Sequence, residues 1–151
     1  MLDDQSRKLL RNFQDDPECP MAELASRSGM TPATAARRLD KMATTGVLAG
    51  QHAVIDWQQL GYMVEVSLRF TLDKTNPRAF DEFLTEARKV PEVVEIQTFL
   101  GRVDVRLSVI ARDIGHYQQL YRSRILALPH IAELEALMHV ATIKTTSGLP
   151  I

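Results

Sequence analysis

Three basic residues, Arg37, Arg38 and Lys41, are spaced so that one helix presents them on the same side. The helix expected to carry them begins at Thr31, whose hydroxyl can cap a helix, and continues with Pro32, which suits the first helical position. Small or short polar residues near the start of a helix, followed by Arg and Lys, suit entry into the major groove of double-stranded DNA. The residues predicted to face DNA are Thr31, Ala33, Thr34, Arg37, Arg38 and Lys41. A solvated basic face with no role in DNA binding is the alternative at this point.

The elements that would position these residues form a helix-turn-helix. Gly29 supplies the permissive backbone for the turn between the two helices, and Gly46 is placed to end the second one. Small and apolar residues predict the buried seam of the pair: Leu24, Ala25, Ala35, Leu39 and Met42. An additional helix is expected from an Asp3 cap to about Gln14, and residues 47–56 suggest a short extended element or a wing-like hairpin.

Composition limits the classes of function. The chain has 151 residues and a net charge of −1, so any affinity for DNA must come from local placement of charge. Its single cysteine, Cys19, excludes an intrachain disulfide and a cysteine-based metal cluster, and fits a reducing compartment. No apolar run approaches membrane-spanning length, and the first residues lack the pattern of a signal peptide. We therefore expect a cytoplasmic protein with no membrane partner, no metal and no cofactor.

The second half of the chain alternates strands and helices in the order βαββαβ. Strands are expected at 62–72, 93–100, 104–111 and 131–143, and helices at 76–89 and 114–128, with Phe80, Phe83, Leu84 and Ala87 on the inner stripe of the first. This order is that of the ferredoxin-like split βαβ arrangement, an antiparallel sheet with both helices on one face. The predicted fold class is therefore α+β, with a winged-type helix-turn-helix domain followed by a ferredoxin-like domain.

The face of the sheet without helices needs a partner if it is apolar. Met63, Ile96, Leu100 and Ile110 alternate with polar neighbours and predict a partly apolar face. Such a face pairs with another copy or binds something else, and a homodimer is the interpretation favoured here. A solvated face with scattered apolar residues is the alternative.

The loop between the second and third strands could bind a small charged molecule. Gly101 allows close approach of the backbone, and Asp104 could accept hydrogen bonds from an ammonium group. Arg102 could pair with a carboxylate or be a solvated turn residue. From the residues alone, a plain hairpin connection explains this loop as well.

Taken together, these motifs resemble the Lrp/AsnC family of transcriptional regulators over nearly the whole chain. The motifs carrying the resemblance are Leu2-Asp3, Arg7-Lys8-Leu9-Leu10, Glu23-Leu24-Ala25, Gly29-Met30-Thr31, Arg37-Arg38-Leu39, Gly46-Val47-Leu48, Gly50, Leu60-Gly61-Tyr62, Pro91-Glu92-Val93-Val94, Gly101-Arg102-Val103-Asp104, Lys144 and Leu149-Pro150. The resemblance implies a DNA-binding domain over 1–50, a linker over 51–61, and an effector-binding and oligomerisation domain over 62–151. It also implies a homodimer that assembles to a tetramer or octamer, and an amino-acid effector bound near Leu100, Gly101, Arg102, Val103 and Asp104.

The chain departs from the family pattern at four positions. Ser6 stands where Asp is frequent, and Gln51 stands where an aromatic residue often follows the linker glycine. Val105 replaces a frequent aromatic residue, and Ala136 replaces a frequent threonine. The last two lie where they could reshape the effector pocket or abolish it.

Two other functions were weighed against DNA-binding regulation. Siroheme decarboxylases share this architecture but carry a histidine-rich active-site segment, whereas His52, His116, His130 and His139 are scattered here. A ligand-sensing module without DNA binding would not need the Arg37, Arg38 and Lys41 face. The sequence therefore predicts a sequence-specific DNA-binding transcriptional regulator, not an enzyme, modulated by an amino acid or a related metabolite.

Overall fold

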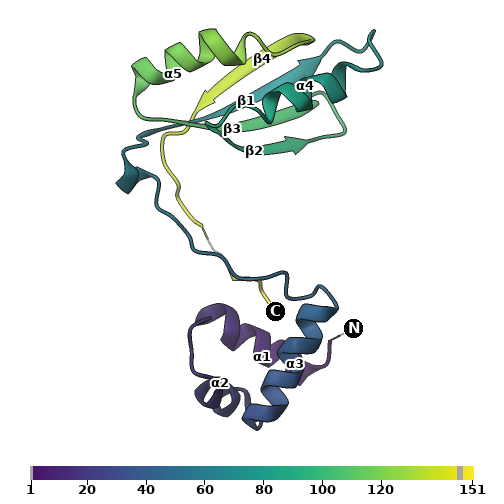
Figure 1. Cartoon of the computed structure of the whole chain (residues 1–151), viewed down its shortest axis with the longest axis vertical. Helices are drawn as coiled ribbons and strands as arrows, with labels where there is room; N and C mark the ends of the chain where they lie inside the picture. The colour runs from purple at the N-terminus through teal and green to yellow at the C-terminus, as the bar shows by residue number, and fades with distance from the viewer. Residues whose placement is uncertain (1, 146–147) are drawn as a thin grey trace. The chain divides into compact units, whose positions relative to one another are not determined.

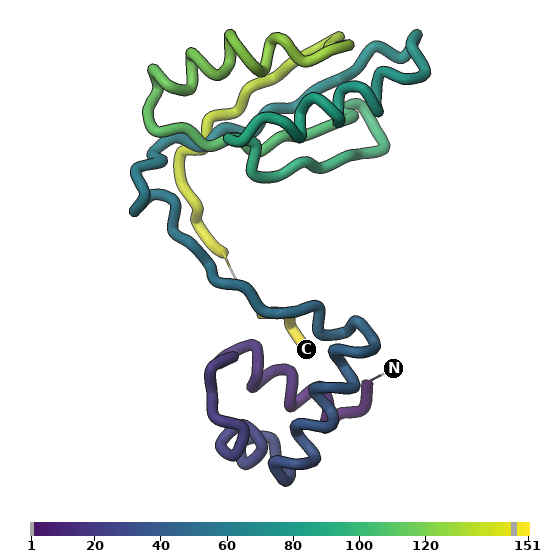
Figure 2. Tube along the Cα trace, in the orientation of Figure 1, coloured from purple at the N-terminus to yellow at the C-terminus, as the bar shows by residue number. Residues whose placement is uncertain are grey.

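The computed structural model describes residues 2–145 and 148–151, which pack as two units (Figures 1 and 2). The helical unit comprises Met1–Val54 together with Ile143–Ile151, and the sheet unit comprises Ile55–Thr142. Residues at the end of the chain therefore pack with the helical unit, whereas the sequence assigned all of 62–151 to the second domain. Hydrogen bonds to the first helix, described below, are the physical reason for this difference.

The helical unit contains three helices, α1 (Asp4–Asp15), α2 (Met21–Ser28) and α3 (Pro32–Thr44). The Asp3 carboxylate caps α1 by accepting the Ser6 N–H at 2.8 Å, and the Thr31 hydroxyl caps α3 by accepting the Thr34 N–H at 3.3 Å. Gly29 ends α2 in the left-handed conformation, with φ of 74°. The predicted caps and turn are confirmed.

The core of the helical unit is the predicted seam. Its buried residues are Leu9, Leu24, Ala25, Ala35, Leu39 and Met42. Alanines at positions 25 and 35 let α2 and α3 approach closely, because neither has side-chain atoms beyond Cβ. Residues 47–56 follow α3 as two bends and then irregular chain, so the structure contains neither the extended element nor the wing-like hairpin expected for this segment.

The sheet unit has the predicted βαββαβ order and forms a single antiparallel sheet with strand order β2-β3-β1-β4. Its elements are β1 (Val64–Leu72), α4 (Ala79–Ala87), β2 (Val93–Thr98), β3 (Val105–Ala111), α5 (Ile114–Leu120), a π-helical turn (Tyr121–Ile125) and β4 (Ile131–Met138), preceded by a 3-10 turn (Gln58–Leu60). Helices α4 and α5 cover the same face of the sheet (Figure 1). The ferredoxin-like topology is confirmed.

The core of this unit lies between the sheet and the two helices. Alternate residues of β1 from Val66 to Leu72 are buried, and the Phe70 ring packs against Phe83 of α4 with centroids 4.9 Å apart. The prediction that Phe80 lies on the inner stripe of α4 is wrong, because it is 40% exposed at the margin of that stripe. The last strand ends at Met138, five residues earlier than predicted.

The helix-free face of the sheet differs from its prediction. Of the four apolar residues expected there, only Ile110 occupies it, as the ladder partner of Glu65. Ile96 instead packs against the core, and Met63 and Leu100 lie outside the strands. The prediction for Ile96 is wrong because the pairing of β2 with β3 shifts register between Val93 and Glu95, which changes the face of the sheet on which the following residues lie.

Charged side chains cover this face in place of the expected apolar ones. Arg69 of β1 lies 3.5 Å from Glu135 of β4, and Arg106 of β3 lies 2.9 Å from Glu95 of β2. Arg69 and Arg106 are direct ladder partners, so two guanidinium groups lie side by side with a carboxylate beyond each. The open face therefore combines these ion pairs with two apolar residues, Ile110 and Leu137.

Candidate nucleic-acid interface and effector loop

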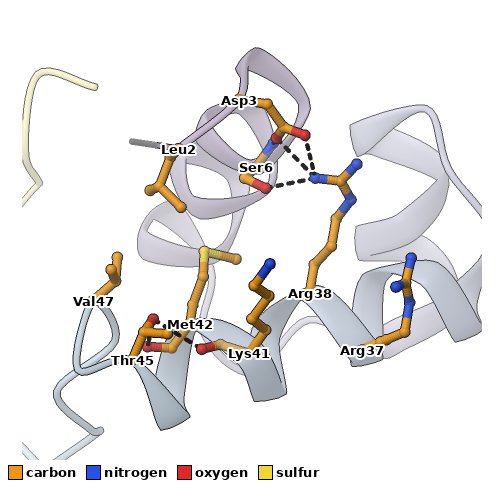
Figure 3. Close-up of a pocket in the computed structure, with 9 residues that line it drawn as sticks. All are labelled: Leu2, Asp3, Ser6, Arg37, Arg38, Lys41, Met42, Thr45 and Val47. Atoms are coloured by element: carbon orange, nitrogen blue, oxygen red, sulfur yellow. Dashed lines mark hydrogen bonds and ion pairs between the residues drawn. The ribbon is translucent and has the colours of Figure 1, made fainter.

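Helix α3 presents a basic surface to solvent. Thr34, Arg37 and Lys41 follow one another at helical spacing on the side away from the buried seam, and Arg37 and Lys41 are exposed. Within residues 2–145 and 148–151, neither of these two cations lies within 4 Å of a carboxylate. Figure 3 shows both side chains extending from α3. They line a cavity of about 610 Å³. Their charge is available to an anionic partner such as a phosphate.

The start of α3 is also accessible. Thr31 and Ala33 are exposed, and the hydroxyls of Thr31 and Thr34 lie 2.9 Å apart. These short side chains leave the first turn of the helix open to close approach. In a helix-turn-helix, this is the part of the second helix that meets base edges.

Arg38 has a different environment from its two basic neighbours. Its Nη1 donates to both carboxylate oxygens of Asp3 at 2.8 Å and to the Ser6 hydroxyl at 2.6 Å (Figure 3). Its Nη2 donates to Gln5 Oε1 at 3.0 Å. Only 22% of the Arg38 side chain is exposed. Arg38 thus ties α3 to the first turn of α1, and its predicted contact with DNA stays a prediction.

This cluster also changes the acidity of Asp3. Hydrogen bonds from Arg38, and then from Ser6, hold the pKa of the Asp3 carboxyl well below its ordinary value of 3.8. Sequence reasoning found Asp3 as a cap and Arg38 as a DNA contact, but not the bond between them. No local pattern signals a partner 35 positions away.

The predicted effector loop follows β2, and its carboxylate already has partners. Asp104 Oδ2 accepts the Leu72 N–H at 2.8 Å, and Oδ1 lies 3.5 Å from the Lys74 amine. The backbone N–H of Asp104 also donates to Phe70 O at 2.9 Å. Asp104 therefore holds the end of β1 against the loop in addition to any role in ligand binding.

The other four loop residues are more accessible. Leu100 and Gly101 are fully open to solvent, and Val103 is half-buried. The Arg102 carbonyl accepts a hydrogen bond from the Thr71 hydroxyl at 3.0 Å, while its guanidinium side chain is 90% exposed and lies 3.9 Å from Glu133. Leu100, Gly101 and Arg102 thus face solvent while Val103 and Asp104 are partly buried, and effector binding by this loop stays a prediction.

The histidines relevant to the decarboxylase alternative do not share an environment. Three histidines of the sheet unit each contact a different glutamate: His116 with Glu92, His130 with Glu82, and His139 with Glu65. The fourth, His52, belongs to the helical unit. In the described part of the chain, no group of three or more His, Cys, Asp or Glu side chains is arranged to hold a metal ion. Nor does any described helix have the length and apolar character needed to cross a membrane.

Comparison with known families identifies the class of protein. A model described as the Lrp/AsnC ligand binding domain matches residues 65–149, and a model of winged helix-turn-helix DNA-binding domains matches residues 2–48. The chain belongs to the Lrp/AsnC family, and it is a DNA-binding transcriptional regulator.

Individual relatives agree with this assignment. The chain is 28% identical to a proline dehydrogenase transcriptional activator of Rhodobacter capsulatus, over 87% of this chain and 86% of the relative. It is 29% identical to an AsnC family transcriptional regulator of Agrobacterium tumefaciens of known structure, with a TM-score of 0.87 and coverage of 99% and 97%. The transcriptional regulator NMB0573 of Neisseria meningitidis, solved as a complex with L-Met, shares the fold with a TM-score of 0.90 at 22% identity, over 99% of this chain and 97% of that one.

Proposed function

We propose that this regulator binds duplex DNA through α3 and that an amino acid bound at the 100–104 loop modulates the binding. The observation that carries the DNA-binding part is the exposed face of Thr34, Arg37 and Lys41, whose two cations are not neutralised by carboxylates in the described chain. Thr31 and Ala33 lie at the start of the same helix and would approach base edges. The hydrogen bonds of Arg38 to Asp3 fix the position of α3 relative to α1.

A dimer is the assembly that such a surface needs. Two copies related by a twofold axis would place their α3 helices in successive major grooves of a pseudo-palindromic site. Large exposed apolar residues of the sheet unit, among them Met63, Phe99 and Leu100, support self-association. The open face of the sheet carries ion pairs beside Ile110 and Leu137, so a sheet-to-sheet contact through it would be partly polar. As a regulator of transcription, the dimer, or a tetramer or octamer built from it, would act in the cytoplasm.

The effector part of the proposal rests on the chemistry of the loop. A free amino acid carries one ammonium and one carboxylate group. The exposed Arg102 guanidinium suits the carboxylate, and Asp104 Oδ1, whose other contact is an exposed lysine, suits the ammonium. Leu100, Gly101 and Val103 would line the entrance. The L-Met complex of the Neisseria regulator supports an amino acid as the class of ligand.

Titration with labelled duplex from the region upstream of the gene for this chain tests DNA binding. The double variant Arg37→Ala, Lys41→Ala should weaken binding and reduce the slope of log affinity against log salt by about two, one for each phosphate contact removed. Lys8→Ala, which removes an exposed cation from α1, is the matched control and should leave the slope unchanged. If the double variant matched the control, α3 would not be the DNA-binding element.

A further inference from the structure

Residues 148–151 lie against α1 of the helical unit and are held there by backbone recognition. The Gln14 side-chain amide makes two hydrogen bonds with Leu149, donating from Nε2 to the carbonyl at 2.9 Å and accepting the N–H on Oε1 at 2.8 Å. Arg11 Nε donates to the carbonyl of Ile151 at 2.6 Å. Because Arg11 and Gln14 are three positions apart, α1 presents both on one side. Together they bind the peptide backbone much as a neighbouring strand would.

Apolar side chains line a cavity beside these hydrogen bonds, although Leu149 itself is 66% exposed. The segment lines a cavity of about 690 Å³ whose walls come from α1, from the stretch after α3 and from the segment itself, and include Leu10, Phe13, Leu48, Leu149 and Ile151. Gly148 lies next to the Gln14 side chain, since a Cβ there would be in van der Waals contact with Gln14 Nε2 at 3.4 Å.

This arrangement changes how the two units are connected. The first segment of the helical unit ends at Val54, residues Ile55–Thr142 form the sheet unit, and the chain belongs to the helical unit again from Ile143. We infer that residues 148–151 are a clasp that fastens the chain to α1 and so provides a second tether between the units. A displacement at the end of β4 would then act on α1 as well as on the linker, and α1 is bonded to α3 through Asp3 and Arg38. The clasp is inferred from the hydrogen bonds of Arg11 and Gln14 with residues 149 and 151. Its effect on DNA binding rests in addition on the proposed function.

Hydrogen exchange of the full-length protein tests the clasp without DNA. The Leu149 amide donates to Gln14 and Pro150 contributes no amide, whereas the Ile151 amide donates to the Leu149 carbonyl, so the exchange of Leu149 is followed at single-residue resolution by NMR. Gln14→Ala should raise exchange of the Leu149 amide at least about tenfold, because it removes both hydrogen bonds with that residue. Lys8→Ala, on the same helix and outside these bonds, should not. Arg11→Ala, which keeps the Gln14 bonds, should give a smaller increase.

DNA titration of the same variants tests the tether. Loss of the second connection should lower the affinity of Gln14→Ala for DNA by about threefold or more relative to Lys8→Ala, since a loosely tethered helical unit is less well ordered for binding. Exchange at the rate of an unstructured peptide in the native protein, or no change in Gln14→Ala, would overturn the clasp. Lost protection with unchanged affinity would overturn the tether alone. If no form of the protein bound DNA, the proposed function would fail while the exchange result stood.

Discussion

Replacing Asp104 by Ala tests the structural role of this carboxylate at the end of β1, in protein that carries no effector. The carboxylate accepts the Leu72 N–H at 2.8 Å, and Leu72 is only 4% exposed. In Asp104→Ala the donor at the end of β1 loses its acceptor in a place that water reaches poorly. The variant should therefore be less stable even when no ligand is present.

The structure sets the size of this effect. A net loss of about 1.5–3 kcal/mol is expected for a hydrogen bond to a charged acceptor. The ion pair with Lys74 adds less than about 1 kcal/mol, because that amine is 3.5 Å away on a side chain that is 68% exposed. At about 2 kcal/mol, the unfolding midpoint of the sheet unit should fall by roughly 8–16 °C, given a shift of about 4–8 °C per kcal/mol for a unit of this size.

Calorimetric or urea unfolding of the ligand-free protein measures this change. Asp104→Asn keeps an oxygen acceptor for the Leu72 N–H. Its free energy of unfolding should therefore fall by less than half as much as that of Asp104→Ala. Lys74→Ala removes only the ion pair and should lower the free energy of unfolding by less than about 1 kcal/mol. If Asp104→Ala unfolded within about 0.5 kcal/mol of the native protein, the inferred role of this carboxylate at the end of β1 would be refuted.

Two further predictions concern the helical unit. Because folding lowers the pKa of Asp3 below 3.8, its bond with Arg38 stabilises the unit above that pH and is lost progressively as the pH falls below it. Asp3→Asn should be less stable at neutral pH and should lose less additional stability in acid unfolding between about pH 4 and 2; an identical acid response in both proteins would contradict this. Leu24→Ala should lower the free energy of unfolding, measured in urea, by about 2–5 kcal/mol, because Leu24 is 1% exposed and its removal leaves a cavity between the helices. Met21→Ala is the control: this position of α2 is 38% exposed, so the same measurement should show a much smaller decrease.

Local sequence signals predicted the helix-turn-helix closely. The caps at Asp3 and Thr31, the turn at Gly29 and the buried seam all depend on neighbours within a few positions, so the sequence carries the information needed to find them. The βαββαβ order of elements along the sheet unit followed in the same way from alternation and helix breaks. Phe80 and Ile96 were misplaced because each lies where a small rotation or a register shift decides which side it faces.

The sequence by itself determined the elements, their order and the residues offered on the outer side of α3. Only the tertiary structure decided which polar groups those elements bring together: Arg38 with Asp3, Asp104 with Leu72, and Gln14 with Leu149. These partners are 35, 32 and 135 positions apart. Hydrogen-bond patterns within a helix or strand repeat every few residues and can be recognised in the sequence, whereas a bond between elements depends on how the chain packs. For that reason the sequence predicted Arg38 as a DNA contact, and the structure found it bound to the start of α1.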